Sequence, residues 1–200
     1  MSTSQNNLPS RWFVTMFRVR YQETDKMGVV YHANYLNWFE IGRTEMLRSL
    51  GFTYREMEEQ GVLLPVTNAA VDFKSPARYD DNIAVYTRMT SFTPLRIGYE
   101  YEIRRREPGA ADAAQSTSED AVQSASEDAV QSTSEDAAQS ASADGALQEQ
   151  ARVRETLLVS GTTSHVWVNG EWKPARLDRH APERYAAIVK ALSQKEEADR

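Results

Sequence analysis

The sequence predicts an α+β domain in which one long helix packs against an antiparallel sheet. Three observations predict this fold class. Several segments alternate apolar and polar residues, which is typical of half-buried strands. One segment, residues 34–50, carries its apolar residues at helical spacing instead. The elements follow in the order β-α-β-β-β-β-α, and a run of consecutive strands after one helix favours an α+β arrangement.

The first expected elements are a strand over residues 12–21 and the long helix. One face of the strand carries Phe13, Thr15, Phe17 and Val19. The helix covers Asn34 to Leu50 and stops at Gly51, because glycine is favoured just after a helix. Its apolar positions are Leu36, Phe39, Ile41, Met46, Leu47 and Leu50.

Two further residues indicate how this helix packs. Trp38 and Gly42 widen its apolar surface, so we expect the helix to be buried on more than one side. A glycine within a helix costs about 1 kcal/mol relative to alanine. A close approach of the helix to the sheet would explain Gly42.

The remaining elements are short. A second helix is expected over residues 53–60, ended by Gly61. The expected strands are residues 63–73, 83–92, 95–105 and 152–168. A C-terminal helix begins near Ala181, with Pro182 in its first turn. We expect a flexible N-terminus over residues 1–11 and one domain over residues 12–195.

A low-complexity segment interrupts this domain at residues 107–150. It contains ten of the 29 acidic residues and none of the 23 basic ones, so the rest of the chain is mildly basic. Four eight-residue repeats fill it: AAQSTSED, AVQSASED, AVQSTSED and AAQSASAD. Such a composition predicts disorder, because it cannot bury enough apolar surface. The flanking strands read as a hairpin, so we interpret the insert as a tolerated loop expansion. A partner-docking or phosphorylated segment is the alternative.

Composition excludes several classes of function. There is no cysteine, so disulfides, thiolate metal sites and cysteine nucleophiles are absent. No GxGxxG, GxxxxGKS/T, GxSxG or HExxH motif occurs, which leaves no support for a nucleotide loop, a serine hydrolase or a metal site. The N-terminus has no signal-peptide pattern, and no apolar run approaches the ~20 residues of a membrane span. We expect a cytoplasmic protein that needs no cofactor.

The stretch YQETDKMGVVYHANY, residues 21–35, carries the candidate chemistry. Asp25 lies in a loop before the long helix, and Gly28 permits tight backbone geometry there. A helix N-terminus presents unpaired N–H groups that can stabilise an oxyanion. A nearby carboxylate can activate water or attack directly, so this pair suits acyl transfer. On spacing alone, Asp25 could equally be a turn-forming residue.

A family resemblance supports the chemical interpretation. The run Y-x-x-T-D-x-M-G-V-V-Y-H-A-N-Y-L-x-W-F-E-x-x-R, from Tyr21 to Arg43, resembles the bacterial 4-hydroxybenzoyl-CoA thioesterase-like acyl-CoA hydrolases, especially the branch associated with the Tol-Pal system. FKSPARYDD at residues 73–81 and SGTTSHVWV at residues 160–168 are similar to the family as well. The resemblance covers nearly the whole chain apart from the insert and the termini. It implies a hot-dog fold, a helix wrapped by a curved antiparallel sheet.

The resemblance also implies roles for individual residues. Asp25 would be the nucleophile or general base toward an acyl-CoA thioester, and the His32 backbone N–H would be the oxyanion donor. The loop would be shaped by Gly28, Tyr31, Asn34 and Tyr35. The CoA phosphates would be bound by basic residues near strand ends, for which the candidates are Lys74, Arg78, Arg104, Arg105 and Arg106; ordinary solvated charge is the alternative for each. The family works as a dimer or tetramer, with active sites between protomers.

Other interpretations stay open at this point. The same fold could bind an acyl thioester without catalysis, act on a carrier-protein thioester, or be a dehydratase or hydratase, although the histidine motif expected for the last is not seen. Glu40 and Arg43 could orient the loop or form an ordinary helix-surface pair. An acyl pocket could be lined by the aromatic residues Tyr31, Trp38, Phe39 and Tyr54, most of which we expect in the core. The acyl group itself is not predicted.

Overall fold

The computed structural model describes residues 11–107 and 154–197. The predictions for the N-terminal segment and for the repeat insert lie almost entirely outside these residues. The chain divides into two units, one comprising residues 1–105 and 156–200 and the other residues 106–155. The second unit is described only at its two ends, where the Glu107 N–H donates to the Arg154 carbonyl oxygen at 2.9 Å. The account below concerns the first unit.

A five-stranded sheet in the order β1-β4-β5-β6-β3 forms the centre of this unit. The strands are β1 (Phe13–Arg18), β3 (Val66–Phe73), β4 (Asn82–Phe92), β5 (Arg96–Arg106) and β6 (Glu155–Val166). β1 pairs antiparallel with β4, and β3 pairs antiparallel with β6. The predicted α+β class is therefore confirmed, and the two strands that flank the insert, β5 and β6, are neighbours as expected.

Two of the predicted strands are wrong in their extent. The strand predicted over residues 63–73 is divided into β2 (Val62–Leu63) and β3, with Pro65 between them. Proline has no N–H to donate to a neighbouring strand, so pairing is interrupted there. β2 leaves the main sheet and pairs with β7 (Val168–Asn169), which is the end of the strand predicted over residues 152–168.

The first strand is also shorter than predicted, because β1 ends at Arg18. A 3₁₀ helix, η1 (Tyr21–Glu23), follows it and begins the loop before the long helix. The alternation predicted for this strand is confirmed: residues 13, 15 and 17 are partly buried, residues 14, 16 and 18 are exposed, and Val19 is buried.

The long helix α1 (Asn34–Ser49) confirms the predicted element to within one residue. The chain leaves it through Leu50 and Gly51, whose φ of +88° favours glycine. Gly42 is buried against β4, where an added Cβ would lie 2.9 Å from Val85 Cγ1. The close approach that we expected to explain Gly42 is thus present. Leu36, in contrast, was predicted on the apolar face but is 44% exposed.

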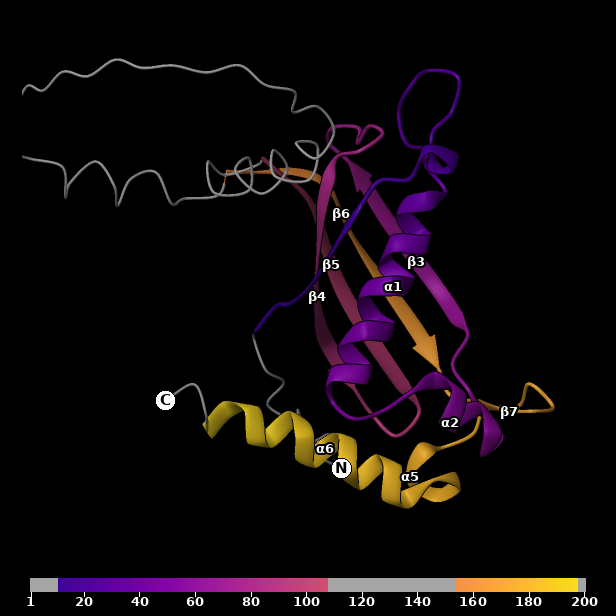
Figure 1. Cartoon of the computed structure of the whole chain (residues 1–200). Helices are drawn as coiled ribbons and strands as arrows, with labels where there is room; N and C mark the ends of the chain where they lie inside the picture. The colour runs from indigo at the N-terminus through magenta and orange to yellow at the C-terminus, as the bar shows by residue number, and fades with distance from the viewer. Residues whose placement is uncertain (1–10, 108–153, 198–200) are drawn as a thin grey trace, which may run out of the picture. The chain divides into compact units, whose positions relative to one another are not determined.

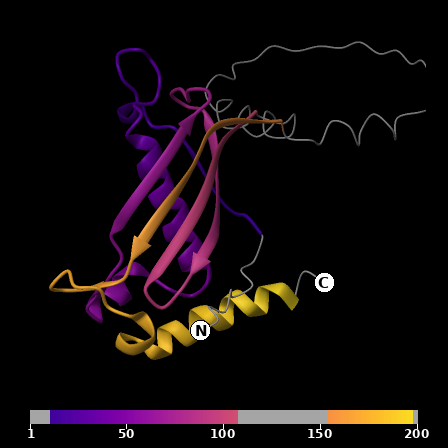
Figure 2. The same cartoon turned by 180° about the vertical axis from the view of Figure 1, so that it is seen from behind.

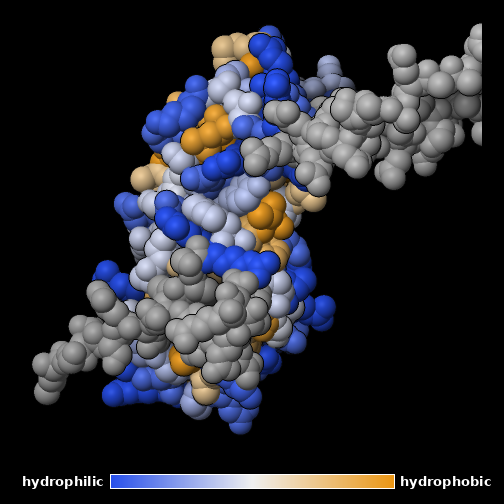
Figure 3. All heavy atoms as spheres, turned by 90° about the vertical axis from the view of Figure 1, so that its left-hand side faces the viewer, coloured by the Kyte–Doolittle hydropathy of each residue, from blue (hydrophilic) through white to orange (hydrophobic). Residues whose placement is uncertain are grey.

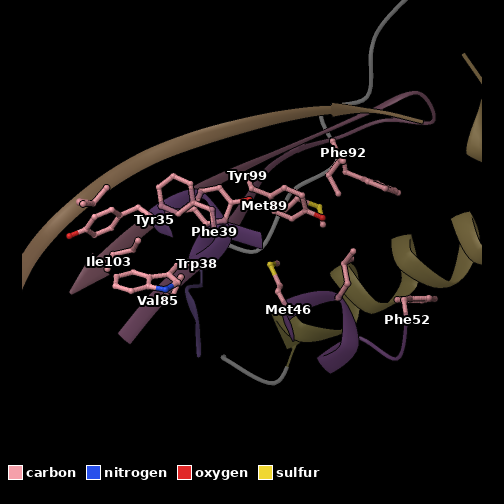
Figure 4. Close-up of a cluster of buried hydrophobic side chains, with 14 of the residues drawn as sticks. Tyr35, Trp38, Phe39, Met46, Phe52, Val85, Met89, Phe92, Tyr99 and Ile103 are labelled. Atoms are coloured by element: carbon pink, nitrogen blue, oxygen red, sulfur yellow. The ribbon is translucent and has the colours of Figure 1, made fainter. Parts of the chain in front are cut away.

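α1 lies along one face of the sheet, and the core fills the space between them (Figure 1). Figure 4 shows Tyr35, Trp38, Phe39 and Met46 of α1 facing residues of the sheet. Those sheet residues include Val85, Met89, Tyr99 and Ile103, all of which are buried. Phe39 stacks on Tyr101 with 4.2 Å between ring centroids. The opposite face of the sheet carries no helix among the described residues (Figure 2).

Three further helices complete the unit. α2 (Tyr54–Glu59) is capped by the Thr53 side chain, which accepts a hydrogen bond from the Glu56 N–H. α5 (Leu177–His180) and α6 (Pro182–Glu197) lie across the end of the sheet near the β4–β5 turn (Figure 1). Phe92 stacks on Tyr185 there, at 5.5 Å between ring centroids. Among the described residues, no helix is both long and apolar enough to cross a membrane.

Candidate active site

The loop between η1 and α1 is a compact turn that presents Asp25. The Asp25 N–H donates to the Val29 carbonyl oxygen at 2.9 Å, and the Gly28 N–H donates to the Asp25 carbonyl oxygen at 2.9 Å. Thr24 and Val30 form an isolated antiparallel bridge at the base of this turn. Gly28 has φ of +72°, a conformation that side chains rarely adopt, which explains why a glycine is suited to this position.

The two oxygens of the Asp25 carboxylate have different surroundings. Oδ1 accepts a 2.8 Å hydrogen bond from the Met27 N–H, which is an Asx turn. Within the described residues, Oδ2 accepts no hydrogen bond. The turn-forming role that we kept as an alternative is therefore real. It does not exclude a chemical role, because the Asx turn fixes the carboxylate and leaves Oδ2 available.

The start of α1 offers backbone donors in the same region. Among the described residues, the N–H groups of His32 and Ala33 donate to no acceptor, whereas the Asn34 N–H donates to the Tyr31 carbonyl oxygen at 2.9 Å. The His32 side chain is exposed and lies against the Tyr31 ring, with 4.3 Å between ring centroids. These two N–H groups, at the positive end of a 16-residue helix, can donate hydrogen bonds to a developing negative charge.

Glu23, which the sequence interpretation did not single out, connects this loop to the helix. Its carboxylate accepts hydrogen bonds from the Arg20 N–H at 2.7 Å and from the Trp38 indole N–H at 2.9 Å. Its carbonyl oxygen accepts from the Tyr31 N–H at 2.9 Å and from Asn34 Nδ2 at 2.8 Å. The only signal in the sequence was the buried Trp38, whose indole N–H requires an acceptor.

Tyr35 holds a second chain segment against the loop. Its hydroxyl accepts a 2.9 Å hydrogen bond from the Ala77 N–H, and the Ala77 carbonyl oxygen accepts from the Val30 N–H at 2.9 Å. Burial raises the pKa of the Tyr35 hydroxyl, and the charge of Asp81 adds to this effect against the opposing Ala77 hydrogen bond. Tyr35 therefore stays protonated at neutral pH, and its hydroxyl joins the segment at Ala77 to the start of α1.

Of the predicted CoA-binding residues, the structure brings only Arg78 next to the loop. Its guanidinium nitrogen lies 3.5 Å from the Gly28 carbonyl oxygen. The others contact acidic side chains: Lys74 with Asp72, Arg104 with Glu102, Arg105 with Asp81 and Arg106 with Glu155.

Arg43 is directed away from the loop and into a buried polar cluster. It donates a 2.7 Å hydrogen bond to the Tyr54 hydroxyl, while Glu40 lies 3.5 Å from it on the helix surface. Nearby, the Thr163 hydroxyl bridges the Tyr101 hydroxyl and His165 Nε2, each at 2.8 Å. The pair of Glu40 and Arg43 is therefore not placed to orient the loop, and Tyr54 contributes to this cluster.

The fold and the site together define a class of protein. One long helix packed against a curved antiparallel sheet, with a loop that carries Asp25 before the helix N-terminus, is the hot-dog arrangement that the family resemblance implies. Residues 19–169 match the model of the thioesterase-like superfamily, which is more than half of the chain. The chain belongs to this superfamily, and the resemblance is confirmed.

Two curated relatives and one solved structure illustrate the similarity. YneP of Bacillus subtilis is 46% identical over 85 residues, which is 42% of this chain and 62% of that protein. The acyl-CoA thioester hydrolase YbgC of Escherichia coli O6:H1 is 42% identical over 97 residues, which is 48% of this chain and 70% of that protein. The DHNA-CoA thioesterase of Staphylococcus aureus has a TM-score of 0.63 and 28% identity, with coverage of 94% of this chain and 95% of that chain. The match to YneP thus spans less than two thirds of that relative.

Proposed function

We propose that this protein hydrolyses acyl-CoA thioesters to a carboxylic acid and CoA. One observation carries the proposal. In the part of the chain that the structure describes, Asp25 Oδ2 and the N–H groups of His32 and Ala33 make no hydrogen bond, and they belong to the same short loop and helix start. A carboxylate and an oxyanion site are the two groups that thioester hydrolysis needs.

In the general-base route, Asp25 accepts a proton from a water molecule as the water oxygen attacks the thioester carbonyl carbon. The carbonyl oxygen becomes an oxyanion, which the His32 N–H stabilises. When the tetrahedral intermediate collapses, the C–S bond breaks, the carboxylic acid forms and the CoA thiolate leaves. The thiolate then takes up the proton that Asp25 accepted, which restores the carboxylate.

In the nucleophilic route, Asp25 Oδ2 attacks the carbonyl carbon itself and the CoA thiolate leaves. The product is a mixed anhydride between Asp25 and the acyl group. Water then hydrolyses this anhydride, which releases the acid and leaves Asp25 protonated; the CoA thiolate takes up that proton, which restores the carboxylate. Both routes use the same oxyanion donor, so the geometry supports the roles of Asp25 and His32 without choosing between the routes.

CoA as the carrier of the acyl group is supported by the relatives, since both the Escherichia coli protein and the Staphylococcus aureus structure are named for CoA thioesters. We also propose that the protein acts in the cytoplasm. We further propose that Arg78 contacts the CoA phosphates, because its guanidinium lies beside the loop. Lys74, Arg104 and Arg105 are weaker candidates, since each contacts an acidic side chain.

We also propose that two copies of the chain associate through β3. This strand is at the end of the sheet and pairs only with β6 among the described strands. Seven of its eight residues are exposed, and Val66 and Phe73 are 50% and 52% exposed. An exposed strand edge with apolar side chains favours pairing with another strand. On the face of the molecule shown in Figure 3, apolar residues form only separate patches among hydrophilic ones.

Thiol release from short, medium, long and aromatic acyl-CoAs tests the proposal, with the Asp25→Asn variant beside the natural protein. Release that depends on Asp25 is the expected result, and the preferred substrate would show which acyl group fits. Binding of an acyl-CoA without thiol release would instead identify a non-catalytic binding protein. Thiol release only from acyl carrier protein thioesters would identify carrier-protein thioesters as the substrate class.

A further inference from the structure

We propose that Glu23 is a positioning residue for the reaction, which sets the location of Asp25 relative to the oxyanion donor at His32. This inference rests on the proposed function. It concerns a residue that touches neither the acyl group nor the water, and acts only through the loop. Its basis is that four hydrogen bonds to Glu23 join the residue before η1, the end of the loop and the helix α1.

The carboxylate joins the beginning of the loop to the helix. Oε2 accepts from the Arg20 N–H at 2.7 Å, and Oε1 accepts from the Trp38 indole N–H at 2.9 Å. Trp38 is fully buried on the face of α1 that packs against the sheet, so it is a fixed point of the core. The carboxylate therefore fixes the position of the loop relative to the core of the protein.

The carbonyl oxygen of Glu23 joins the two ends of the loop. It accepts from the Tyr31 N–H at 2.9 Å and from Asn34 Nδ2 at 2.8 Å. Asp25 is two residues after Glu23, and His32 directly follows Tyr31. A displacement of Glu23 would consequently change the separation between the carboxylate of Asp25 and the N–H of His32.

A carboxylate is required at this position for a chemical reason. The Arg20 N–H and the Trp38 indole N–H can only donate hydrogen bonds, and an ionised carboxylate offers one accepting oxygen to each. A glutamine amide has one accepting oxygen, and its NH₂ group would face the second donor. Glu23→Gln thus keeps the size of the side chain but forces one of the two contacts apart.

The experiment compares Glu23→Gln with Glu59→Gln, which alters an exposed carboxylate that pairs with Arg55 on α2. Turnover of the best acyl-CoA is measured well below the melting temperature, so that both variants are folded. We expect kcat of Glu23→Gln to fall by about 10- to 100-fold with KM within about twofold, because misplacement of reacting groups lowers turnover to that extent. Glu59→Gln should match the natural protein.

A double variant separates positioning from a general loss of stability. Trp38→Phe removes the indole donor, so the glutamine NH₂ no longer faces a donor there. Glu23→Gln should therefore lower kcat much less in the Trp38→Phe background than in the natural protein. If Glu23 only stabilised the fold, kcat per folded molecule would not change in Glu23→Gln or in the double variant.

Amide hydrogen exchange supplies a readout that does not depend on activity. The Met27, Gly28 and Tyr31 N–H groups should exchange faster in Glu23→Gln and at unchanged rates in Glu59→Gln. Normal kcat in Glu23→Gln, with Asp25→Asn inactive, would overturn the positioning role and leave the proposed function standing. If the natural protein released no thiol from any acyl-CoA, the proposed function would fail. Unchanged exchange in the loop of Glu23→Gln would then overturn the positioning role separately.

Discussion

The Met27 N–H donates a 2.8 Å hydrogen bond to Oδ1 of Asp25, and this bond gives the candidate catalytic residue a structural task as well. Asparagine can form the same bond through its carbonyl oxygen, whereas alanine cannot. The two substitutions therefore separate the chemistry of Asp25 from its turn.

We expect Asp25→Asn to lower kcat by about 100-fold or more, because a carboxamide neither accepts the proton of water nor attacks a thioester. Its free energy of unfolding should stay within about 0.5 kcal/mol of the natural protein. Asp25→Ala should be equally inactive and also about 1 kcal/mol less stable, because the turn hydrogen bond is lost. Thiol release and urea unfolding measure the two effects. Activity retained in Asp25→Asn would contradict both mechanistic routes.

Gly42 gives a prediction about packing. A methyl group at this position would lie 2.9 Å from Val85 Cγ1 and would also meet the Thr87 side chain. Alanine is the better helix former, yet overpacking of this contact should outweigh that gain. We expect Gly42→Ala to lose about 1–3 kcal/mol of unfolding free energy, measured in urea. Asn37→Ala, on an exposed position of the same helix, is the control and should change stability by less than about 0.5 kcal/mol.

Much of this architecture could be predicted from local sequence. The bounds of α1 follow from helical spacing and from Gly51, and the strand faces follow from the alternation of residues such as Phe13 and Phe17. The candidate loop could be predicted because Asp25 and Gly28 lie in the segment that precedes the helix. These signals all lie within a few residues of the element they define.

The unforeseen features depend on residues that are distant in sequence. Glu23 and Trp38 are 15 residues apart, and neither shows from its neighbours that the two side chains meet. The exit of β2 from the main sheet depends on its pairing with β7, more than 100 residues later. The exposure of β3 could not be predicted either. Alternation predicts that one face of a strand is buried, but not whether this chain or another covers that face.

The exposed edge of β3 predicts how self-association can be disrupted. Ala70 is exposed in this strand, and a lysine there would place a charge at the proposed interface. We expect Ala70→Lys to convert a dimer to a monomer with unchanged circular dichroism. Val14→Lys, on β1 at the other edge of the sheet, should leave the dimer intact. Sedimentation velocity distinguishes the two, and a dimer that survives Ala70→Lys would exclude β3 as the interface.

Removal of most of the repeat insert, residues 111–146, should leave activity and oligomer size unchanged. At the base of the insert, the Glu107 N–H already donates to the Arg154 carbonyl oxygen at 2.9 Å, so the strand pair is closed there without the repeats. Long loop insertions and deletions change the closure entropy only slightly. Thiol release and size-exclusion chromatography of the deletion variant are the measurements. A loss of either property would assign the repeats a role in the domain.

His165 predicts how stability depends on pH. Burial, with a smaller effect from the charge of Arg43, lowers the pKa of His165 from 6.5 to about 4. Above pH 6.5 this histidine is neutral in both the folded and the unfolded protein, so its lowered pKa does not change the free energy of unfolding. As the pH falls below 6.5 the unfolded chain binds a proton that the folded protein excludes, and stability decreases until about pH 4. The loss is roughly 1.4 kcal/mol for each pH unit in this window.

We therefore expect the natural protein to lose more unfolding free energy than His165→Gln between pH 6.5 and pH 4. Glutamine does not titrate, and its amide can still contact the Thr163 hydroxyl that now bonds to Nε2. The carboxylates titrate in both proteins, so the difference between the two urea-unfolding curves isolates the histidine. His180→Gln, which changes an exposed histidine, should keep the slope of the natural protein. Parallel curves for the natural protein and His165→Gln would show that His165 titrates normally in the folded state.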